Sequence, residues 1–231
     1  MGERVRYERG DGVATIAMDD GKVNVMSLGM QAELHDALDR AEADGAAVVI
    51  AGRPGVLSAG FDLQVLQGGG TDAVDMVIGG FELAARVLAF PRPVIVACTG
   101  HAIAMGAFLL LSGDHRVGAD GAYKYVANEV AIGLTMPRPA LAILRQRLTP
   151  AAFERAAVLA EPFDPSAALA AGFLDEVVPA DEVVARATER ARLATALDPT
   201  AHAATKQRAR AATLDAIARG IELDRAELVP A

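Results

Sequence analysis

The feature that most limits the fold is a run without charged side chains, residues 94–111, which contains no Asp, Glu, Lys or Arg. The run is long enough to raise the possibility of a membrane-spanning helix. Turn-forming residues argue against a span, because Pro91-Arg92-Pro93 precede the run and Thr99-Gly100-His101 interrupt it. We therefore expect a buried strand, a turn and a buried helix here, and no membrane partner.

Composition describes a globular chain of one large domain, or of one domain with an appendage. The 231 residues are 52% hydrophobic and 23% charged, with a net charge of −8. The small basic cluster of Lys206, Arg208 and Arg210 does not predict nucleic-acid binding. The single cysteine, Cys98, excludes an internal disulfide and fits a reducing compartment.

Metal binding and export are not predicted either. The four histidines lie at positions 35, 101, 115 and 202, without the paired spacing of metal ligands. Residues 1–10 are charged and lack the apolar run of a signal peptide. We expect a cytoplasmic protein without a metal.

Hydrophobic periodicity predicts alternating strands and helices, which is typical of an α/β fold. One helix is expected to bury Met30, Leu34, Ala37, Leu38 and Ala41 and to end near Asp44-Gly45, and a second runs through Phe81 to Leu88. The expected strands are residues 5–8, 13–18, 47–51, 94–98 and 115–119. Residues 52–60 are expected to form turns and 68–70 a loop.

The character of the chain changes near Asp181. From there the sequence is helical and rich in Ala, Arg and Glu, and only Asp198-Pro199 interrupts it. We predict a core of residues 1–180 that carries the functional site and a helical segment of residues 181–231 that serves in assembly or as a lid.

Two glycine-containing turns are candidates for a binding site. Ser58-Ala59-Gly60-Phe61-Asp62-Leu63 follows a buried strand, and Gly60 would turn the backbone so that the next amide points outward. The simpler interpretation is a helix start with Asp62 in the first turn. Residues 100–106 repeat the pattern, and a helix N-terminus there offers amides to an oxyanion, or else is only a packed core helix. Neither segment matches a serine-hydrolase elbow or a phosphate loop.

Four other side chains have both a functional and a structural interpretation. Glu129 precedes an apolar patch, so it is either a solvated surface acid or, if buried, an acid/base group whose pKa is raised. Cys98 is expected to be a core thiol, His101 a satisfied imidazole and Lys206 a solvated cation.

Taken together, these segments resemble the crotonase (enoyl-CoA hydratase/isomerase) superfamily over nearly the whole chain. The resemblance rests on the segments 58–63, 99–102 with Gly106, Asp114, 128–133 and 168–178 (ALAAGFLDEVV). It implies a crotonase-like spiral of ββα units with a C-terminal α-helical segment. It also implies a coenzyme A thioester as substrate, no separate cofactor, and assembly into a homotrimer or dimer of trimers.

The resemblance also implies roles for individual residues. The backbone amides of Phe61 and Met105 would form an oxyanion hole for the thioester carbonyl, and Glu129 would be the catalytic acid/base. The remaining substrate- or coenzyme-binding positions that it implies are Ser58, Ala59, Gly60, Asp62, Leu63, Gly106 and Phe108.

Phe108 departs from the family pattern, because hydratases carry the first of two glutamates at this position. Phenylalanine cannot bind or activate water, whereas moving a double bond between positions 3,4 and 2,3 needs only one base. We therefore expect isomerase-like chemistry. The alternatives are a hydratase with a substitute acid (Asp72, Asp75 or Glu82) and a non-catalytic acyl-CoA-binding protein.

Overall fold

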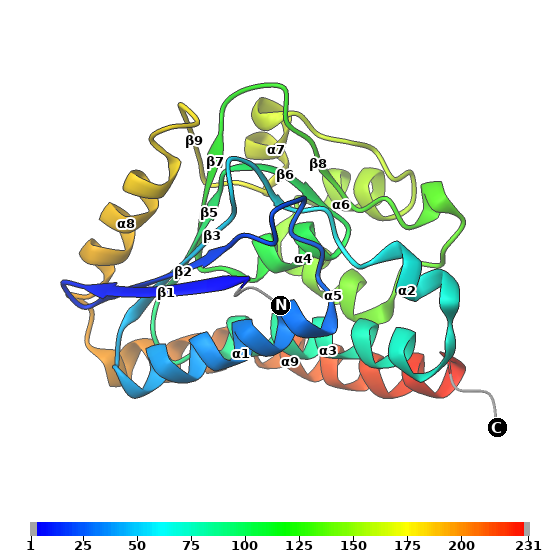
Figure 1. The fold of residues 1–231 in the computed structure, drawn as a ribbon, viewed down its shortest axis with the longest axis horizontal. Helices are drawn as coiled ribbons and strands as arrows, with labels where there is room; N and C mark the ends of the chain where they lie inside the picture. Colours follow the sequence, from blue (N-terminus) through cyan, green and yellow to red (C-terminus); the bar gives the residue numbers. More distant parts are fainter. Residues whose placement is uncertain (1–3, 229–231) are drawn as a thin grey trace.

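Two β-sheets of different size organise the chain in the computed structural model, which describes residues 4–228 (Figure 1). The larger sheet has the order β1-β2-β3-β5-β7-β9, in which only β1 and β2 are antiparallel. Its strands are β1 (Val5–Gly10), β2 (Val13–Met18), β3 (Ala47–Ala51), β5 (Val94–Cys98), β7 (His115–Ala119) and β9 (Glu176–Val178). The smaller parallel sheet contains β4 (Gly55–Ser58), β6 (Gly100–Ile103) and β8 (Tyr125–Val126).

Helices cover both faces of the larger sheet (Figure 1). Along β3, Val48 and Ile50 join the core formed with α1, α3 and α4, whereas Val49 packs with α8 on the opposite face. This alternation explains why β3 is apolar at every position. The helices are α1 (Leu28–Ala43), α2 (Leu63–Gly68), α3 (Gly70–Ala89), α4 (Met105–Ser112), a 3₁₀ turn η1 (Val130–Ile132), α5 (Arg138–Arg147), α6 (Pro150–Ala157), α7 (Pro165–Ala171), α8 (Val183–Ala194) and α9 (Pro199–Leu228).

The charge-free run contains a buried strand, β5, and a buried helix, α4, as predicted. The turn expected between them is wrong, because residues 100–103 form β6 in the smaller sheet. A Cβ on Gly100 would lie 2.0 Å from the carbonyl carbon of Gly55, so this glycine permits close strand contact. No helix within residues 4–228 is long and apolar enough to cross a membrane.

Two glycine-rich segments also contain more regular structure than predicted. Residues 52–60 include β4, and the expected loop at 68–70 is the junction between α2 and α3. Gly69 there has φ of 63°, a conformation that glycine adopts without strain. The predicted antiparallel strands and the helix ending at Asp44 are confirmed.

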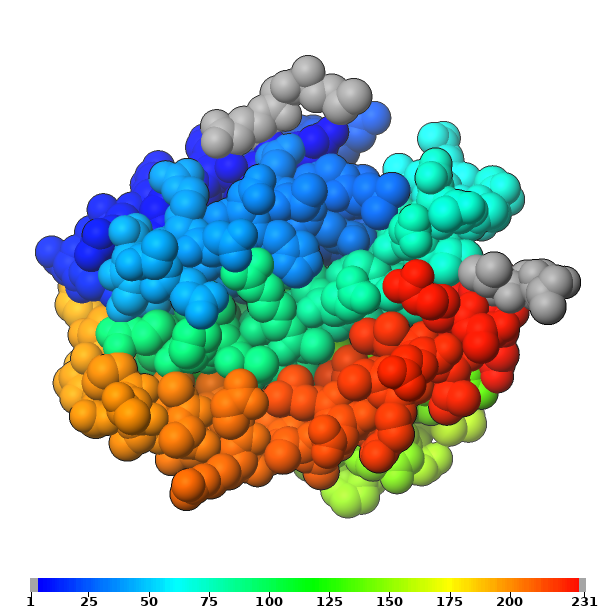
Figure 2. Space-filling model, turned by 90° about the horizontal axis from the view of Figure 1, so that it is seen from below, coloured from blue at the N-terminus to red at the C-terminus, as the bar shows by residue number. Residues whose placement is uncertain are grey.

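The helical C-terminal part packs against the core within the same chain. The face of α8 is buried on the larger sheet, and α9 contacts α3 and α5. Figure 2 shows α1, α3 and α9 as adjacent bands across one face. The domain division and the assembly or lid role of residues 181–231 stay predictions, and their last three residues lie outside the described part. The expectation of a solvated Lys206 is wrong, because it is buried 2.8 Å from Asp114.

Candidate active site

The first glycine-containing turn is fixed by buried hydrogen bonds. Ser58, at the end of β4, donates through its Oγ to the Asn24 carbonyl at 2.6 Å and accepts from the Gly60 amide at 3.1 Å. The Asn24 side chain in turn donates to the carbonyls of Met18 and Leu57, both at 3.1 Å. Because its hydroxyl is engaged in this way, Ser58 holds the turn in place.

The two glycine-containing turns touch each other. Gly60 has φ of +93°, and a Cβ on it would lie 2.9 Å from the Cβ of Ala104 and 3.4 Å from the Met105 nitrogen. A Cβ on Gly106 would lie 2.3 Å from the Ser58 carbonyl oxygen. Glycine at both positions therefore brings the residue after Gly60, Phe61, close to the start of α4.

The amides of Phe61 and Met105 both lack a protein acceptor within the described part of the chain. Met105 is the first residue of α4, so its N–H has no partner within the helix. Within residues 4–228, neither this amide nor that of Phe61 donates to another protein group. Two unpaired donors on adjacent turns suit an oxygen atom that gains negative charge.

A cavity of about 140 Å³ lies beside these turns. Its walls come from both turns, α2, α3 and the segment around η1. They are Ala59, Phe61, Leu63, Leu66, Val77, Phe81, Ala104, Asn128, Glu129, Ile132, Leu134, Thr135 and Pro137. This enclosure by mostly apolar side chains suits a hydrocarbon chain.

Glu129 is the ionisable side chain of this cavity. It is only 6% exposed, so the interpretation as a solvated surface acid is wrong. Burial raises its pKa to about 7, opposed only by a hydrogen bond to its own backbone. Its Oε2 is buried without a hydrogen-bond partner. A carboxyl group in this setting exchanges a proton readily near neutral pH.

Phe108 lies behind the cavity wall. Its ring is fully buried with its centroid 5.8 Å from that of Phe81, which in turn is 6.2 Å from the ring of Phe61. Phe81 lines the cavity and Phe108 does not. The position at which a hydratase of the resembled family would carry an acid is thus hydrocarbon packed against hydrocarbon.

The remaining predicted site residues divide into two groups. Ala59, Phe61, Leu63 and Glu129 line the cavity, whereas Ser58, Gly60, Asp62, Met105 and Gly106 lie outside its walls and shape the turns. Asp62 caps α2 by accepting from the Gln64 amide at 2.9 Å, as the simpler interpretation predicted. Cys98 is a buried core thiol, as expected.

Sequence reasoning missed the part of the wall that comes from other elements. Val77 and Phe81 lie on α3, and the periodicity there shows only that Phe81 is buried, not what it faces. Asn128 was visible as the neighbour of Glu129. The packing of α3 against the two turns is a tertiary contact, so no local sequence pattern predicts it.

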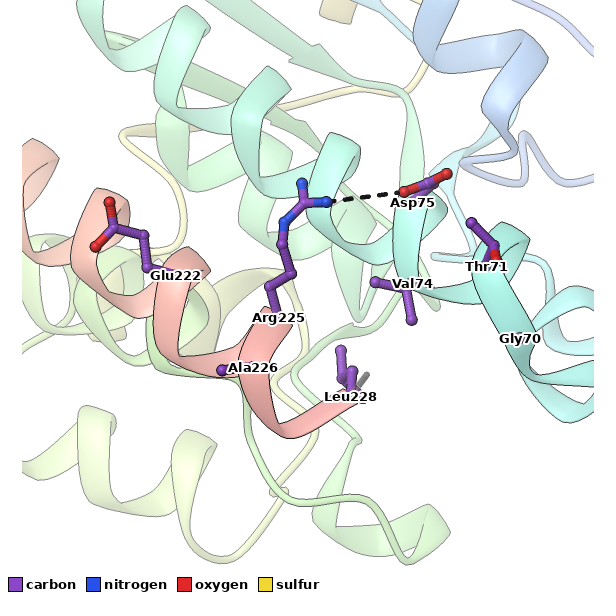
Figure 3. A pocket seen from close by; sticks show the side chains of 8 residues that line it. All are labelled: Gly70, Thr71, Val74, Asp75, Glu222, Arg225, Ala226 and Leu228. Carbon is purple, nitrogen blue, oxygen red and sulfur yellow. Dashed lines mark ion pairs between the residues drawn. The ribbon is translucent and has the colours of Figure 1, made fainter. Parts of the chain in front are cut away.

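A larger cavity, about 710 Å³, lies away from these residues, between the start of α3 and the end of α9 (Figure 3). Asp75 and Arg225 both line it and form an ion pair, with 4.0 Å between Oδ1 of Asp75 and Nη1 of Arg225. Asp72 and Glu82, the other suggested substitute acids, are exposed. None of the three acids lines the cavity that contains Glu129.

Fold and site together describe an α/β protein in which one buried carboxyl group lines a cavity beside two amides that have no protein acceptor among the described residues. No cluster of three or more His, Cys, Asp or Glu that could hold a metal occurs within residues 4–228. The sequence profile of the enoyl-CoA hydratase/isomerase family matches residues 8–229, and the chain belongs to this family. The predicted crotonase resemblance and fold class are confirmed.

Some relatives are named enoyl-CoA hydratases and others enoyl-CoA isomerases. The chain is 32% identical over 228 residues to a probable enoyl-CoA hydratase of Mycobacterium avium (strain 104), covering 96% of this chain and 84% of that protein. It is 53% identical to the enoyl-CoA isomerase of Mycobacterium tuberculosis in its apo structure, with a TM-score of 0.93 and coverage of 96% and 97%. Human mitochondrial Δ3-Δ2-enoyl-CoA isomerase is 29% identical, with a TM-score of 0.91 and coverage of 97% and 90%.

Proposed function

We propose that this protein isomerises enoyl-CoA thioesters, moving a double bond from position 3 to position 2, with Glu129 as the only acid/base. The observation that carries the proposal is that, among the described residues, Glu129 is the one ionisable side chain lining the cavity. The substrate class follows from the family, and the apolar walls suit its acyl chain.

The chemistry needs one base and one site for negative charge. The Glu129 carboxylate removes a proton from C2 of the 3-enoyl thioester, and the electron pair moves onto the thioester oxygen as an enolate. The amides of Phe61 and Met105 donate to this oxygen, and one such donor lowers a barrier by about 3 kcal/mol. The protonated Glu129 then returns the proton to C4, the double bond forms between C2 and C3, and the carbonyl is restored.

Hydration is the rival activity, because relatives carry the hydratase name. It requires a bound water, removal of a proton from that water and delivery of a proton to carbon. Phe108 provides no polar atom, and Asp72, Asp75 and Glu82 lie outside the cavity. These placements support isomerisation with one acid and give no support to a substitute acid.

A non-catalytic acyl-CoA-binding protein is the third candidate. Such a protein has no need for an unpaired carboxyl group within an apolar wall, whose burial disfavours its charged form. The presence of Glu129 therefore favours catalysis. A homotrimer or dimer of trimers, a cytoplasmic location and the absence of a separate cofactor stay predictions.

A side-by-side assay separates the three candidates. We expect purified protein to convert 3-hexenoyl-CoA into the conjugated 2-enoyl thioester and to hydrate crotonyl-CoA poorly. Efficient hydration of crotonyl-CoA would contradict the argument from Phe108. Binding of both thioesters without turnover would instead identify a binding protein.

A further inference from the structure

Gly80 lies in the middle of α3, a 20-residue helix, where glycine is a poor helix former. It is buried and has no unusual backbone angle that would require glycine. An interior helix glycine of this kind usually makes room for something that approaches closely. The residues that pack against Gly80 therefore indicate its role.

Two side chains rest on the bare backbone at Gly80. A Cβ on this residue would lie 2.5 Å from Cε1 and 2.6 Å from Cζ of the Phe61 ring, and 3.3 Å from the Met105 sulfur. These are the two residues whose unpaired amides form the proposed oxyanion hole. One glycine of α3 thus contacts both residues, although they belong to separate turns.

We propose that Gly80 is a positioning residue of the active site. By leaving room for the side chains of Phe61 and Met105, it fixes the positions of the two backbone amides that donate to the thioester oxygen. The inference rests on the proposed function, because it assigns those amides their role. Gly80 itself touches no reacting atom.

The contact distances indicate which neighbour gives way when a methyl group is added. Carbon atoms in contact are normally 3.5–4.0 Å apart, so the Phe61 ring would have to move by about 1 Å. The thioether of Met105 is flexible and at 3.3 Å needs only a small adjustment. The Phe61 ring is less free, because Phe81 packs edge-on against it. Its displacement is therefore passed to the short turn that carries its amide.

The test compares Gly80→Ala with the same change made beside a smaller residue 61. In Gly80→Ala we expect kcat for 3-hexenoyl-CoA to fall about 10- to 100-fold. Misplacing a catalytic group by about 1 Å lowers a reaction rate by a factor of this order. Phe61→Leu lacks Cε1 and Cζ but keeps the backbone amide. The double variant Phe61→Leu/Gly80→Ala should therefore return to within about threefold of Phe61→Leu alone.

A spectroscopic readout isolates the amides from general damage to the fold. The carbonyl stretch of a bound 2-enoyl thioester reports how strongly the amides polarise it, and it needs no turnover. We expect the shift seen in the native protein to shrink in Gly80→Ala and to return in the double variant. This readout also separates the two proposals, because polarisation without isomerase activity would contradict the proposed function and not the role of Gly80.

Gly79→Ala is the matched control on the same helix. Its added Cβ would lie 2.5 Å from Oε1 of Gln31, a buried side chain whose Nε2 donates to the carbonyls of Met26 and Met76, and not against Phe61. We expect kcat within about threefold of the native value. The inference is overturned if Gly80→Ala keeps native kcat, if only KM rises while the carbonyl shift is unchanged, or if the double variant shows no recovery.

Discussion

Two carboxyl groups withdrawn from solvent have opposite surroundings in this protein. Oε2 of Glu129 lies in an apolar wall without a hydrogen-bond partner. Asp114, just after the end of α4, accepts from Lys206 at 2.8 Å and from the Val94 amide at 2.7 Å, and it forms an ion pair with Arg210 at 2.8 Å. One group is left unpaired, and the other joins three segments of the chain.

The difference separates proton transfer from structural support. Burial raises the pKa of Glu129 to about 7, so both of its protonation states are available near neutral pH. Burial also lowers the pKa of Lys206 to about 8. Its ion pair with Asp114 opposes this shift. The paired carboxyl group of Asp114 holds two cations in place, whereas the unpaired one of Glu129 is available to substrate.

The largest expected effect is on the unpaired acid. Glu129→Gln keeps the shape of the side chain and removes its ability to take a proton, so kcat for 3-hexenoyl-CoA should fall about 10³-fold. Steady-state kinetics and thioester binding by calorimetry measure this. Affinity should be nearly unchanged, and a loss of less than tenfold in kcat would show that another group is the base.

The matching change at the paired acid should affect stability and not chemistry. Asp114→Asn leaves Lys206 and Arg210 without a counter-charge and should cost about 3–5 kcal/mol in the free energy of unfolding. Urea unfolding measures the loss, and kcat per folded molecule should stay native. A stability cost below about 1 kcal/mol would mean that the two cations find other partners.

The pH dependence follows from the state that Glu129 must occupy. Proton abstraction requires the carboxylate, so with a pKa near 7 kcat/KM should fall about 50-fold from pH 7 to pH 5 and rise about twofold above pH 7. Initial rates in overlapping buffers test this. A profile flat between pH 5 and 7 would contradict a buried, unpaired base, and residual activity in Glu129→Gln should lose the slope.

The last expected effect is a gain in stability. Because the folded-state pKa of Glu129 lies above its unfolded value, the folded protein binds the proton more tightly, and stability falls as pH rises from about 4.5 to 7. Glu129→Gln removes this penalty and should stabilise the protein by about 3 kcal/mol at pH 8 and by little at pH 4.5. Urea unfolding at both pH values measures the difference. Equal effects at the two would indicate a packing change.

The sequence predicted the elements whose cause is local. The buried face of α1 is visible because apolar residues repeat with a period of 3.6, and β3, β5 and α4 are visible because each is a continuous apolar run. The short strands β4 and β6 were missed. Their glycines indicate turns, and only pairing within the smaller sheet makes them strands.

The candidate site divides in the same way. The sequence by itself determined that Glu129 stands beside an apolar segment and that Phe108 offers no acid. Only the tertiary structure decided that Oε2 of Glu129 is buried without a partner among the described residues, that Gly60 meets the start of α4, and that Gly80 contacts both Phe61 and Met105. Side-chain type and spacing are properties of the chain, whereas burial and contact depend on which distant faces pack together.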